Sequence, residues 1–183
     1  AELKNVDWKG IFGALEVGDI DAIISSVTIT EERRLKYDFS EPYYQVSQRL
    51  IIRKADAGRV KSITDLQGSK VGVQIGTTGA MLMEKLFPTI ERVNYDTPTP
   101  AIADLADGKI GAFMVDEPVA IQYTRHDPQA REKYALIEFR FSEENYGIVV
   151  RKGDEALLKK INAGLKAVRD AGIDQELRKK WML

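Results

Sequence analysis

The sequence contains no cysteine and only one histidine among its 183 residues. The absence of cysteine excludes disulfide bonds, thiolate nucleophiles and cysteine metal sites, and it is compatible with both the cytosol and the periplasm. The single histidine, His126, lies in the polar stretch Arg125-His126-Asp127-Pro128, which predicts a surface loop. A histidine-based catalytic triad and a histidine-rich metal site are therefore unavailable, and we expect no metal and no cofactor.

Long apolar runs and an excess of charge of one sign are also missing. The longest apolar runs, such as residues 22–24 and 50–52, fall far short of the roughly 20 residues that a membrane-spanning helix needs. The first residues lack the basic and apolar parts of a signal peptide, so we expect a mature, trimmed or non-exported chain. Lys plus Arg number 27 against 28 for Asp plus Glu. This balance gives no overall field that attracts nucleic acid or anionic lipid, and it favours a small partner.

The apolar residues follow an alternation of strand and helix patterns. With 44% hydrophobic and 30% charged residues, the chain can bury a core and form one large or two small domains. A strand, a Gly/Thr turn and a helix follow one another repeatedly, which predicts an α/β fold with a parallel sheet. The predicted strands are 2–6, 21–25, 48–54, 70–74, 91–95, 111–116, 135–139 and 146–150, and the predicted helices are 10–17, 80–86, 99–107, 117–125 and 155–181, the last interrupted near Gly172.

Polar residues follow three of the predicted strands, at the carboxyl ends where open α/β sheets bind ligands. They are residues 25–33, the turn Gly76-Thr77-Thr78-Gly79, and Asp116. The Gly/Thr turn offers backbone N–H groups and a helix N-terminus to an anion. It lacks the lysine of a nucleotide P-loop and the spacing of a dinucleotide fingerprint, so a carboxylate is favoured over a phosphate.

Charges of both signs accompany these polar segments. Arg33 can bind a carboxylate through two parallel hydrogen bonds, with Thr28 and the Thr78 N–H beside it. Asp116 supplies a negative charge, so together the residues complement a zwitterion. Each residue also has a purely structural interpretation. Arg33 could be a surface residue at the start of a helix capped by Thr30, and Asp116 could be a helix N-cap before a proline. The Gly/Thr turn could be an ordinary strand-to-helix connection.

Several motifs occur in a specific order along the whole chain: SSVTITEERR, DFSEPYY, VGVQIGTTG, VDEP, ENYGIVVRKGD and LRKKW. This order resembles the polar amino-acid-binding proteins of ABC importers, which are solute-binding proteins with the two-lobed type II fold. The resemblance implies that each lobe is a mixed sheet flanked by helices. Lobe one would comprise residues 1–47 and 143–183, and lobe two residues 48–142, with hinge strands near 43–47 and 143–147.

The resemblance also implies roles for individual residues. Arg33 would hold the ligand α-carboxylate, assisted by Thr28 and the backbone of Thr78, while the Ser26 carbonyl oxygen and the Asp116 side chain would accept hydrogen bonds from the α-ammonium group. Trp8 matches a position that lines the pocket for the ligand side chain. The polar wall of the binding site matches Ser25, Gln74 and Thr77.

The implied function is binding of a polar or basic L-amino acid in a cleft between the lobes, for delivery to the membrane subunits of an ABC transporter. We expect arginine, lysine, histidine or glutamine, because an aromatic face and polar wall residues suit such side chains. The expected location is periplasmic or extracellular, with or without a membrane anchor outside this sequence.

The chain departs from the resembled family at its start. Residues 2–6 would be the second strand, so the first strand, a ligand loop and the first helix of lobe one have no counterpart. We therefore expect a truncated lobe one with an unpaired sheet edge, which is a surface for self-association.

Two other functions stay open from the sequence. The first is the ligand-binding sensor domain of a membrane receptor or kinase. The second is a cyclohexadienyl-dehydratase-like enzyme, for which Glu117 or Glu144 would have to act as general acid.

Overall fold

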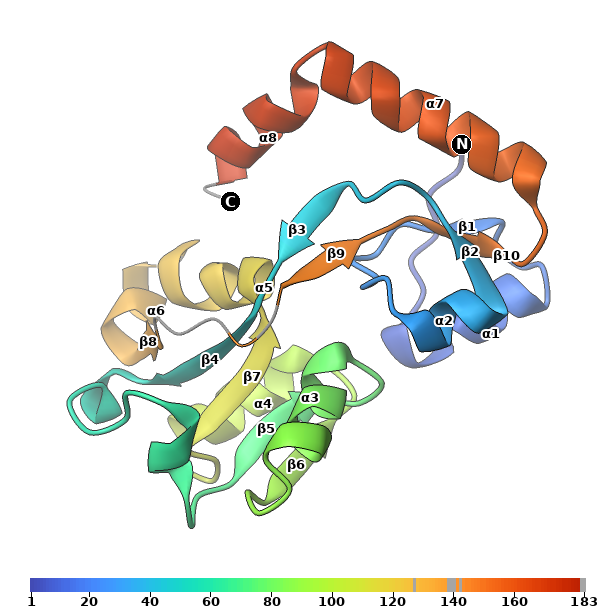
Figure 1. Cartoon of the computed structure of the whole chain (residues 1–183). Helices are drawn as coiled ribbons and strands as arrows, with labels where there is room; N and C mark the ends of the chain where they lie inside the picture. The colour runs from blue at the N-terminus through green and yellow to red at the C-terminus, as the bar shows by residue number, and fades with distance from the viewer. Residues whose placement is uncertain (127, 138–140, 142, 182–183) are drawn as a thin grey trace. The chain divides into compact units, whose positions relative to one another are not determined.

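A computed structural model describes residues 1–126, 128–137, 141 and 143–181 (Figure 1). The chain forms two compact units. Unit 1 combines residues Ala1–Gln45 and Glu144–Leu183, and unit 2 is the continuous segment Val46–Glu143. Each unit contains both strands and helices, so the predicted α/β class is confirmed.

Unit 2 is built on a five-stranded sheet with the order β6-β5-β7-β4-β8. Strand β5 runs parallel to β6 and β7, whereas β4 runs antiparallel to β7 and β8. The sheet is therefore mixed, as the resemblance implies: the parallel pairing expected from the strand-turn-helix pattern holds for β5 with its two neighbours and fails for β4. Strand β4 leads to β5 through two 3-10 turns, η1 (Lys54–Asp56) and η2 (Ile63–Leu66), and lacks the helical crossover that joins parallel neighbours. The strands are β4 (Gln48–Arg53), β5 (Val71–Gln74), β6 (Arg92–Tyr95), β7 (Ala112–Asp116) and β8 (Tyr134–Leu136).

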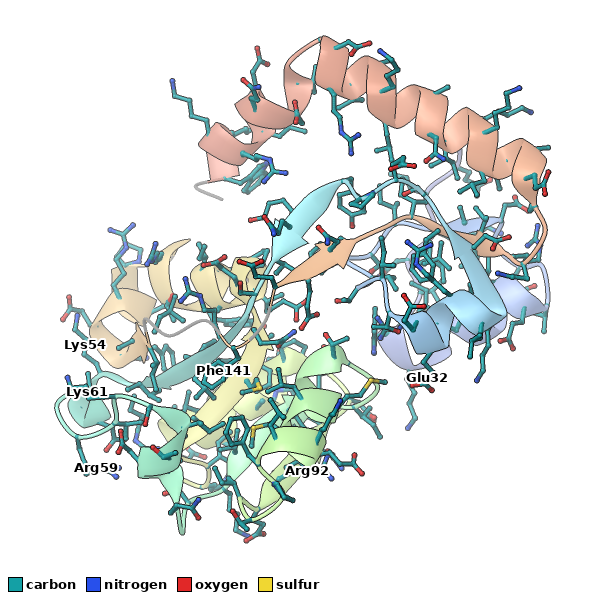
Figure 2. All side chains as sticks on the ribbon, in the orientation of Figure 1. Glu32, Lys54, Arg59, Lys61, Arg92 and Phe141 are labelled. Carbon is teal, nitrogen blue, oxygen red and sulfur yellow. The ribbon has the colours of Figure 1, made fainter. Side chains whose placement is uncertain are left out.

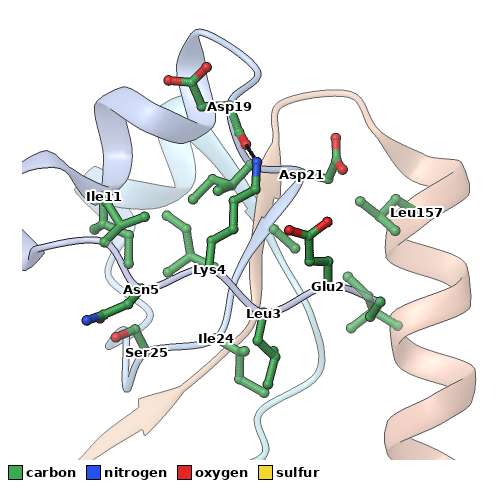
Figure 3. A pocket seen from close by; sticks show the side chains of 16 residues that line it. Glu2, Leu3, Lys4, Asn5, Ile11, Asp19, Asp21, Ile24, Ser25 and Leu157 are labelled. Atoms are coloured by element: carbon green, nitrogen blue, oxygen red, sulfur yellow. Dashed lines mark hydrogen bonds between the residues drawn. The ribbon is translucent and has the colours of Figure 1, made fainter.

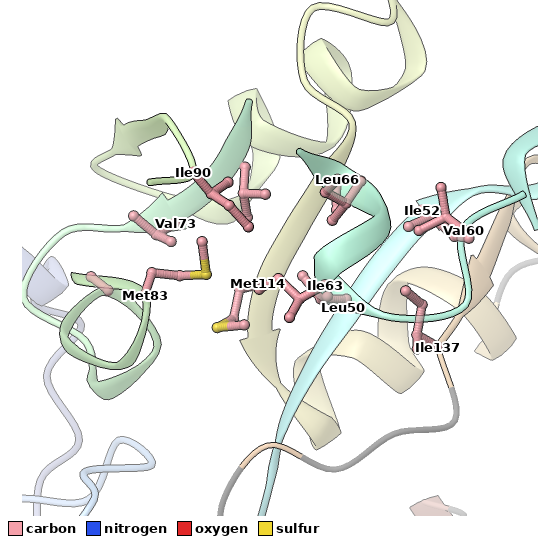
Figure 4. Close-up of a cluster of buried hydrophobic side chains, with 13 residues drawn as sticks. Leu50, Ile52, Val60, Ile63, Leu66, Val73, Met83, Ile90, Met114 and Ile137 are labelled. Atoms are coloured by element: carbon pink, nitrogen blue, oxygen red, sulfur yellow. The ribbon is translucent and has the colours of Figure 1, made fainter. Parts of the chain in front are cut away.

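The two faces of this sheet are covered by different helices. Leu50 and Ile52 of β4 pack in one cluster with Met83 of α3 (Thr78–Leu86), as Figure 4 shows. Ile51 points to the opposite face, where it packs with Leu105 of α4 (Pro98–Ala106). Helix α5 (Glu117–Ile121), a π-helical turn (Gln122–His126) and α6 (Pro128–Lys133) complete the unit. Because side chains alternate along a strand, even-numbered residues of β4 face α3.

Unit 1 contains a three-stranded antiparallel sheet with the order β1-β10-β2. A two-stranded sheet of β3 and β9 lies outside it. The buried core of unit 1 includes Leu15, Ile23 and Val149. The strands are β1 (Ala22–Ile23), β2 (Tyr37–Phe39), β3 (Tyr44–Val46), β9 (Glu144–Tyr146) and β10 (Val149–Arg151), and the helices are α1 (Trp8–Glu16), α2 (Glu31–Lys36), α7 (Glu155–Asp170) and α8 (Ile173–Trp181).

Three sequence-based predictions of secondary structure are wrong. Residues 2–6 are not a strand: among the described residues no strand pairs with them, and only Val6 of this segment packs against the core. The strand expected at 146–150 is two strands, β9 and β10: between them the Gly147 N–H donates to the Val27 carbonyl at 3.0 Å, and pairing with β1 and β2 begins at Val149. The loop expected at 125–128 lies partly in the π-helical turn, which ends at His126, and partly in α6, which begins at Pro128, while Asp127 lies outside the described residues.

Two other predicted features, the interruption of the last helix and the strand at 135–139, have counterparts in the structure. The interruption expected near Gly172 is present, since Gly172 has a φ of +70° between α7 and α8. The strand expected at 135–139 is β8, and positions 138–139 lie outside the described residues.

Candidate functional site

Helix α2 presents Arg33 to the interior of unit 1. Thr30 caps the helix, because its side-chain hydroxyl accepts a hydrogen bond from the Arg33 N–H at 3.2 Å. Glu31 and Glu32 in the first turn complement the helix dipole. Glu32 is exposed to solvent (Figure 2), whereas Arg33 is only 8% exposed. The helix-cap interpretation is therefore correct for Thr30, while the interpretation of Arg33 as a surface residue is wrong.

The guanidinium of Arg33 is held by a carbonyl and two aromatic rings. Its Nη1 donates to the Thr28 carbonyl oxygen at 2.8 Å. Its central carbon lies 5.7 Å from the ring centroid of Trp8 and 5.6 Å from that of Phe12. The two rings of α1 meet edge to face at 5.9 Å. Cation–π contacts of this kind fix the plane of the guanidinium, as two parallel hydrogen bonds to a carboxylate require.

Thr28 and Ser26 lie in the segment between β1 and α2. The Thr28 hydroxyl donates to Glu144 Oε2 at 2.9 Å, and the residue is 4% exposed. Ser26 has a φ of +55°, a conformation that costs a non-glycine residue about 1–3 kcal/mol and is frequent in binding sites. Its N–H donates to the Tyr43 hydroxyl at 3.2 Å. Burial raises the pKa of Tyr43, so this hydroxyl stays neutral at physiological pH.

Ser25, which precedes this strained residue, is exposed in a bend. The structure thus brings Trp8, Thr28 and Arg33 together, with Ser26 on the same short segment.

In unit 2, the Gly/Thr turn connects β5 to α3. Gly76 has a φ of +73°, which a residue with a side chain rarely adopts. The Thr77 hydroxyl donates to the Gln74 carbonyl at 2.7 Å and accepts a hydrogen bond from the Ala80 N–H at 3.3 Å, which caps α3. The Gln74 side-chain amide donates to the Asp96 carbonyl at 3.0 Å. The hydroxyl of Thr77 therefore stabilises the turn, and the amide of Gln74 joins the end of β5 to the residue after β6.

Thr78 and Asp116 come together through a residue that the sequence analysis did not single out. The Gln48 side-chain nitrogen donates to Thr78 Oγ1 at 3.1 Å and to Asp116 Oδ1 at 2.5 Å. Asp116 occupies the N-cap position of α5, but its side chain makes no capping hydrogen bond there. The N-cap interpretation thus describes the backbone of Asp116 and leaves its carboxylate for another role.

Gln48, Phe12 and Tyr43 are contacts that the sequence analysis missed. Gln48 had a recognisable signal: it is a polar residue that shares one strand face with Leu50 and Ile52, both buried. Phe12 follows Trp8 by one helical turn, the spacing at which two side chains lie on one face. Nothing in the sequence points to Tyr43 as the partner of Ser26.

The two carboxylates considered as general acids both have partners. Arg49 Nε donates to Glu117 Oε1 at 3.0 Å, and the two side chains are 10% and 17% exposed. Glu144 accepts from Thr28 as described above. Within the described parts of the chain, no group of three or more His, Asp or Glu side chains is placed to hold a metal ion. No helix in these parts is long and apolar enough to cross a membrane.

A groove of about 700 Å³ lies beside β1 in unit 1 (Figure 3). Strand β1 is at one end of its sheet. Leu157 and Ile161 contribute from α7, a helix of 16 residues in which none is fully buried. Two apolar side chains at the groove, Leu3 and Ile24, are 89% and 62% exposed. The remaining lining residues are Ala1, Glu2, Lys4, Asn5, Val6, Ile11, Asp19, Ile20, Asp21, Ala22, Ile23 and Ser25.

Comparison with known proteins gives one consistent result. The family model of the bacterial extracellular solute-binding proteins, family 3, matches residues 1–183. The L-cystine-binding protein TcyJ of Escherichia coli K12 is 33% identical over 181 residues, covering 99% of this chain and 67% of that protein. This chain spans about two thirds of the length of the curated relatives it matches.

Solved structures of amino-acid-binding proteins share the fold. An ancestral arginine-binding protein bound to glutamine superimposes with a TM-score of 0.90 at 37% identity, covering 98% of this chain and 79% of that one. The ancestral amino acid-binding protein AncCDT-1, a precursor of cyclohexadienyl dehydratase, gives 0.88 at 32% identity, covering 98% and 76%. The predicted two-lobed fold and the predicted resemblance are confirmed. The chain belongs to the bacterial extracellular solute-binding proteins, family 3.

Proposed function

We propose that this protein binds a polar or basic L-amino acid outside the cytoplasm and delivers it to the membrane subunits of an ABC importer. The observation that carries the proposal is the buried guanidinium of Arg33, which lies over the rings of Trp8 and Phe12 and donates a hydrogen bond to the Thr28 carbonyl. A cation prepared in this way suits the α-carboxylate that all amino acids share.

Each unit supplies one part of the recognition chemistry in this proposal. Unit 1 provides the Arg33 guanidinium, oriented by the Thr28 carbonyl, for the α-carboxylate and the Ser26 carbonyl for the α-ammonium group. Unit 2 provides the Thr78 N–H for the carboxylate and the Asp116 carboxylate for the ammonium. The charges of these groups, positive on Arg33 and negative on Asp116, complement those of a zwitterion.

The ligand class follows from the relatives and from the residues near Arg33. TcyJ is named for binding L-cystine, other relatives are named for binding histidine, glutamine or arginine, and structures of an ancestral arginine-binding protein hold glutamine or arginine. With Trp8, Ser25 and Gln74 as side-chain pocket and wall residues, we propose arginine, lysine, histidine or glutamine. Thr77 contributes mainly through the turn that it caps.

The proposed activity is binding without catalysis. A general acid needs a carboxylic acid that can release its proton to a substrate. Glu117 is instead engaged by the guanidinium of Arg49, and Glu144 by the hydroxyl of Thr28. Incubation with a prearomatic cyclohexadienyl acid should therefore produce no aromatic product by ultraviolet absorbance. Formation of the aromatic product would identify an enzyme.

Calorimetric titration against the twenty amino acids and L-cystine tests the function. One or a few polar or basic L-amino acids should bind, and the D-enantiomer and the decarboxylated amine of the best ligand should bind at least tenfold more weakly. A protein that binds none of the panel would contradict the proposal. A transmembrane segment joined to a kinase domain in the same gene would favour the sensor alternative.

We also propose that two copies associate through the groove beside β1. An edge strand with neighbouring exposed apolar side chains can pair with the same edge of a second copy around a two-fold axis. Sedimentation velocity should show a concentration-dependent dimer that Ile24→Lys weakens. Leu86→Lys is the matched control, because Leu86 is also an exposed apolar residue, at 56%, but lies in unit 2. A monomer at every concentration would refute this association.

A further inference from the structure

Gln48 is a polar residue at a fully buried position in unit 2. It begins β4, and none of its surface is exposed. Its neighbours on the same face of β4, Leu50 and Ile52, belong to the apolar core against α3. Burying an amide in such surroundings is unfavourable unless its hydrogen-bonding groups are satisfied. The burial of Gln48 therefore requires hydrogen-bond partners that offset its cost.

The side chain of Gln48 connects two residues of the proposed amino-acid site. Its nitrogen lies 3.1 Å from Thr78 Oγ1 and 2.5 Å from Asp116 Oδ1. Strands β4 and β7 pair so that Gln48 stands opposite Asp116. A side-chain NH₂ group carries two hydrogens, and these two acceptors use both. The NH₂ group must face Asp116, because an amide oxygen there would oppose a carboxylate oxygen.

Gly79 makes this arrangement sterically possible. A Cβ atom at position 79 would lie 2.7 Å from Gln48 Oε1 and 3.5 Å from the Met114 side chain. The start of α3 therefore approaches β4 closely only because it has a glycine there. As a result, the amide of Gln48 is confined from the helix side while its nitrogen faces Thr78 and Asp116.

We propose that Gln48 is a positioning residue for amino-acid recognition: it fixes the orientation of the Asp116 carboxylate and the first residue of α3 without touching the ligand. The inference rests on the proposed function. Asp116 then meets the ligand ammonium in one orientation, and Thr78 presents its backbone N–H in one place. Removing the amide leaves the Asp116 carboxylate and the Thr78 N–H present but no longer held in place. Ligands with an α-ammonium group should therefore lose the most binding affinity.

Gln48→Met tests this role, because methionine has a similar length and no hydrogen-bond donor. The probes are the amino acid that binds most tightly in the panel and its deaminated analogue, which for L-arginine is 5-guanidinopentanoate. We expect Gln48→Met to reduce the affinity for the amino acid roughly tenfold or more, as for the loss of a hydrogen bond to a charged group. The affinity for the analogue should fall at most about threefold. Arg49→Met is the matched control on the opposite face of β4, and it should leave the ratio of the two affinities unchanged.

A double-mutant cycle with Asp116→Asn separates positioning from a general structural effect. If Gln48 acts through Asp116, Gln48→Met should weaken the amino acid less than about threefold when Asp116→Asn is already present. The same tenfold loss in both backgrounds would overturn the inference. Wild-type affinity in Gln48→Met would also overturn it while leaving the proposed function intact, whereas failure of the wild-type protein to bind any amino acid would refute the proposed function itself.

The inference stays testable if Gln48→Met does not fold. The side-chain NH₂ resonances of Gln48 in the wild-type protein can be followed by NMR during titration with the same two probes. A larger shift with the amino acid than with its deaminated analogue supports the coupling of Gln48 to the ammonium group through Asp116. Equal shifts with both probes contradict it.

Discussion

The Nη1 atom of Arg33 donates a hydrogen bond to the carbonyl oxygen of Thr28 at 2.8 Å. The hydroxyl of the same threonine donates to Glu144, 116 residues further along the chain. The cation is therefore oriented by backbone and aromatic groups in the protein alone. Such preorganisation reduces the entropy that a ligand must lose on binding.

Arg33→Ala should reduce the affinity for every amino acid that binds by at least about a hundredfold, because the proposed buried charge-assisted contact to the shared α-carboxylate is lost. Arg33→Lys should recover only part of the affinity, since an ammonium group cannot form two parallel hydrogen bonds in one plane. Calorimetry measures both effects. Arg34→Ala is the control, because Arg34 is the exposed neighbour of Arg33. This variant should bind amino acids as tightly as the wild type does. Undiminished affinity in a folded Arg33→Ala variant would remove the central element of the site.

Asp116→Asn should weaken the binding of amino acids roughly thirtyfold and that of their deaminated analogues only slightly, because the charge that we propose faces the α-ammonium group is removed while the size is kept. Competition titrations with a fluorescent ligand give both affinities. Glu117→Gln is a suitable control, because Glu117 pairs with Arg49 and has no proposed ligand contact. Equal losses for the amino acid and its analogue would assign Asp116 a structural role.

Gly79→Ala should destabilise unit 2 by about 1–3 kcal/mol and weaken amino-acid binding, because the new methyl group would lie 2.7 Å from Gln48 Oε1. Gly164→Ala is the matched control in α7. Nothing lies within 4 Å of a Cβ at position 164, so alanine should stabilise the helix by about 0.5–1 kcal/mol. Urea unfolding measures both changes. A Gly79→Ala variant as stable as Gly164→Ala would contradict the close approach of α3 to β4.

Asp38 should contribute a stability that depends on pH. The hydrogen bond from Lys152, at 2.8 Å, and then the Gly153 N–H, at 2.7 Å, lower the pKa of Asp38 below its usual value. A carboxyl whose pKa is lower in the folded state stabilises the protein above its unfolded pKa, and this stabilisation is lost as pH falls through the folded pKa. Asp38→Asn should therefore flatten the acid side of the stability curve.

The measurement for Asp38 is urea unfolding at a series of pH values from about 7 to about 3. Asp170→Asn serves as the control, because Asp170 forms an exposed pair with Lys166 within one helix. If Asp38→Asn loses stability on acidification as steeply as the wild type, Lys152 and Gly153 do not act through this carboxylate.

Arg178 should stabilise the attachment of α8 to the segment that leads into β3. Its guanidinium lies 4.5 Å from the ring centroid of Tyr44, and its Nη2 donates to the Tyr43 carbonyl at 3.3 Å. Arg178→Ala should cost about 1–2 kcal/mol in the free energy of unfolding. Lys179→Ala, on an exposed neighbour, should cost much less. Equal stability of both variants would show that the ring contact contributes nothing.

Local chemistry made part of this molecule predictable from its sequence. The Gly/Thr turn and the helix after it are specified by adjacent residues, because Gly76 supplies the positive φ and Thr77 caps α3. The direction of β4 was not predictable in this way, because it depends on pairing with β7, more than 60 residues away. Residues 2–6 alternate like a strand, but a strand also requires a neighbour with which to pair.

The same distinction applies to the candidate site. Arg33 could be proposed as a ligand residue from the motif, but its burial depends on Trp8 and Phe12 from a different helix. Asp116 and Thr78 could be proposed individually, whereas their common partner Gln48 depends on three elements meeting at one point. Motif order identifies the residues that can act, and long-range packing determines which groups hold them in place.

The central position of β10 in the sheet of unit 1 has a consequence for the order of folding. Strands β1 and β2 both pair with β10, whose residues Val149–Arg151 are synthesised more than 100 residues after them. During synthesis, the whole of unit 2 is made before β10, so β1 and β2 lack the strand with which they both pair. Unit 1 therefore closes a long loop at a late stage, and contacts of such large sequence separation slow folding. The unit that carries Arg33 is thus the last to complete its sheet, and its apolar strand residues are exposed for longer than those of unit 2.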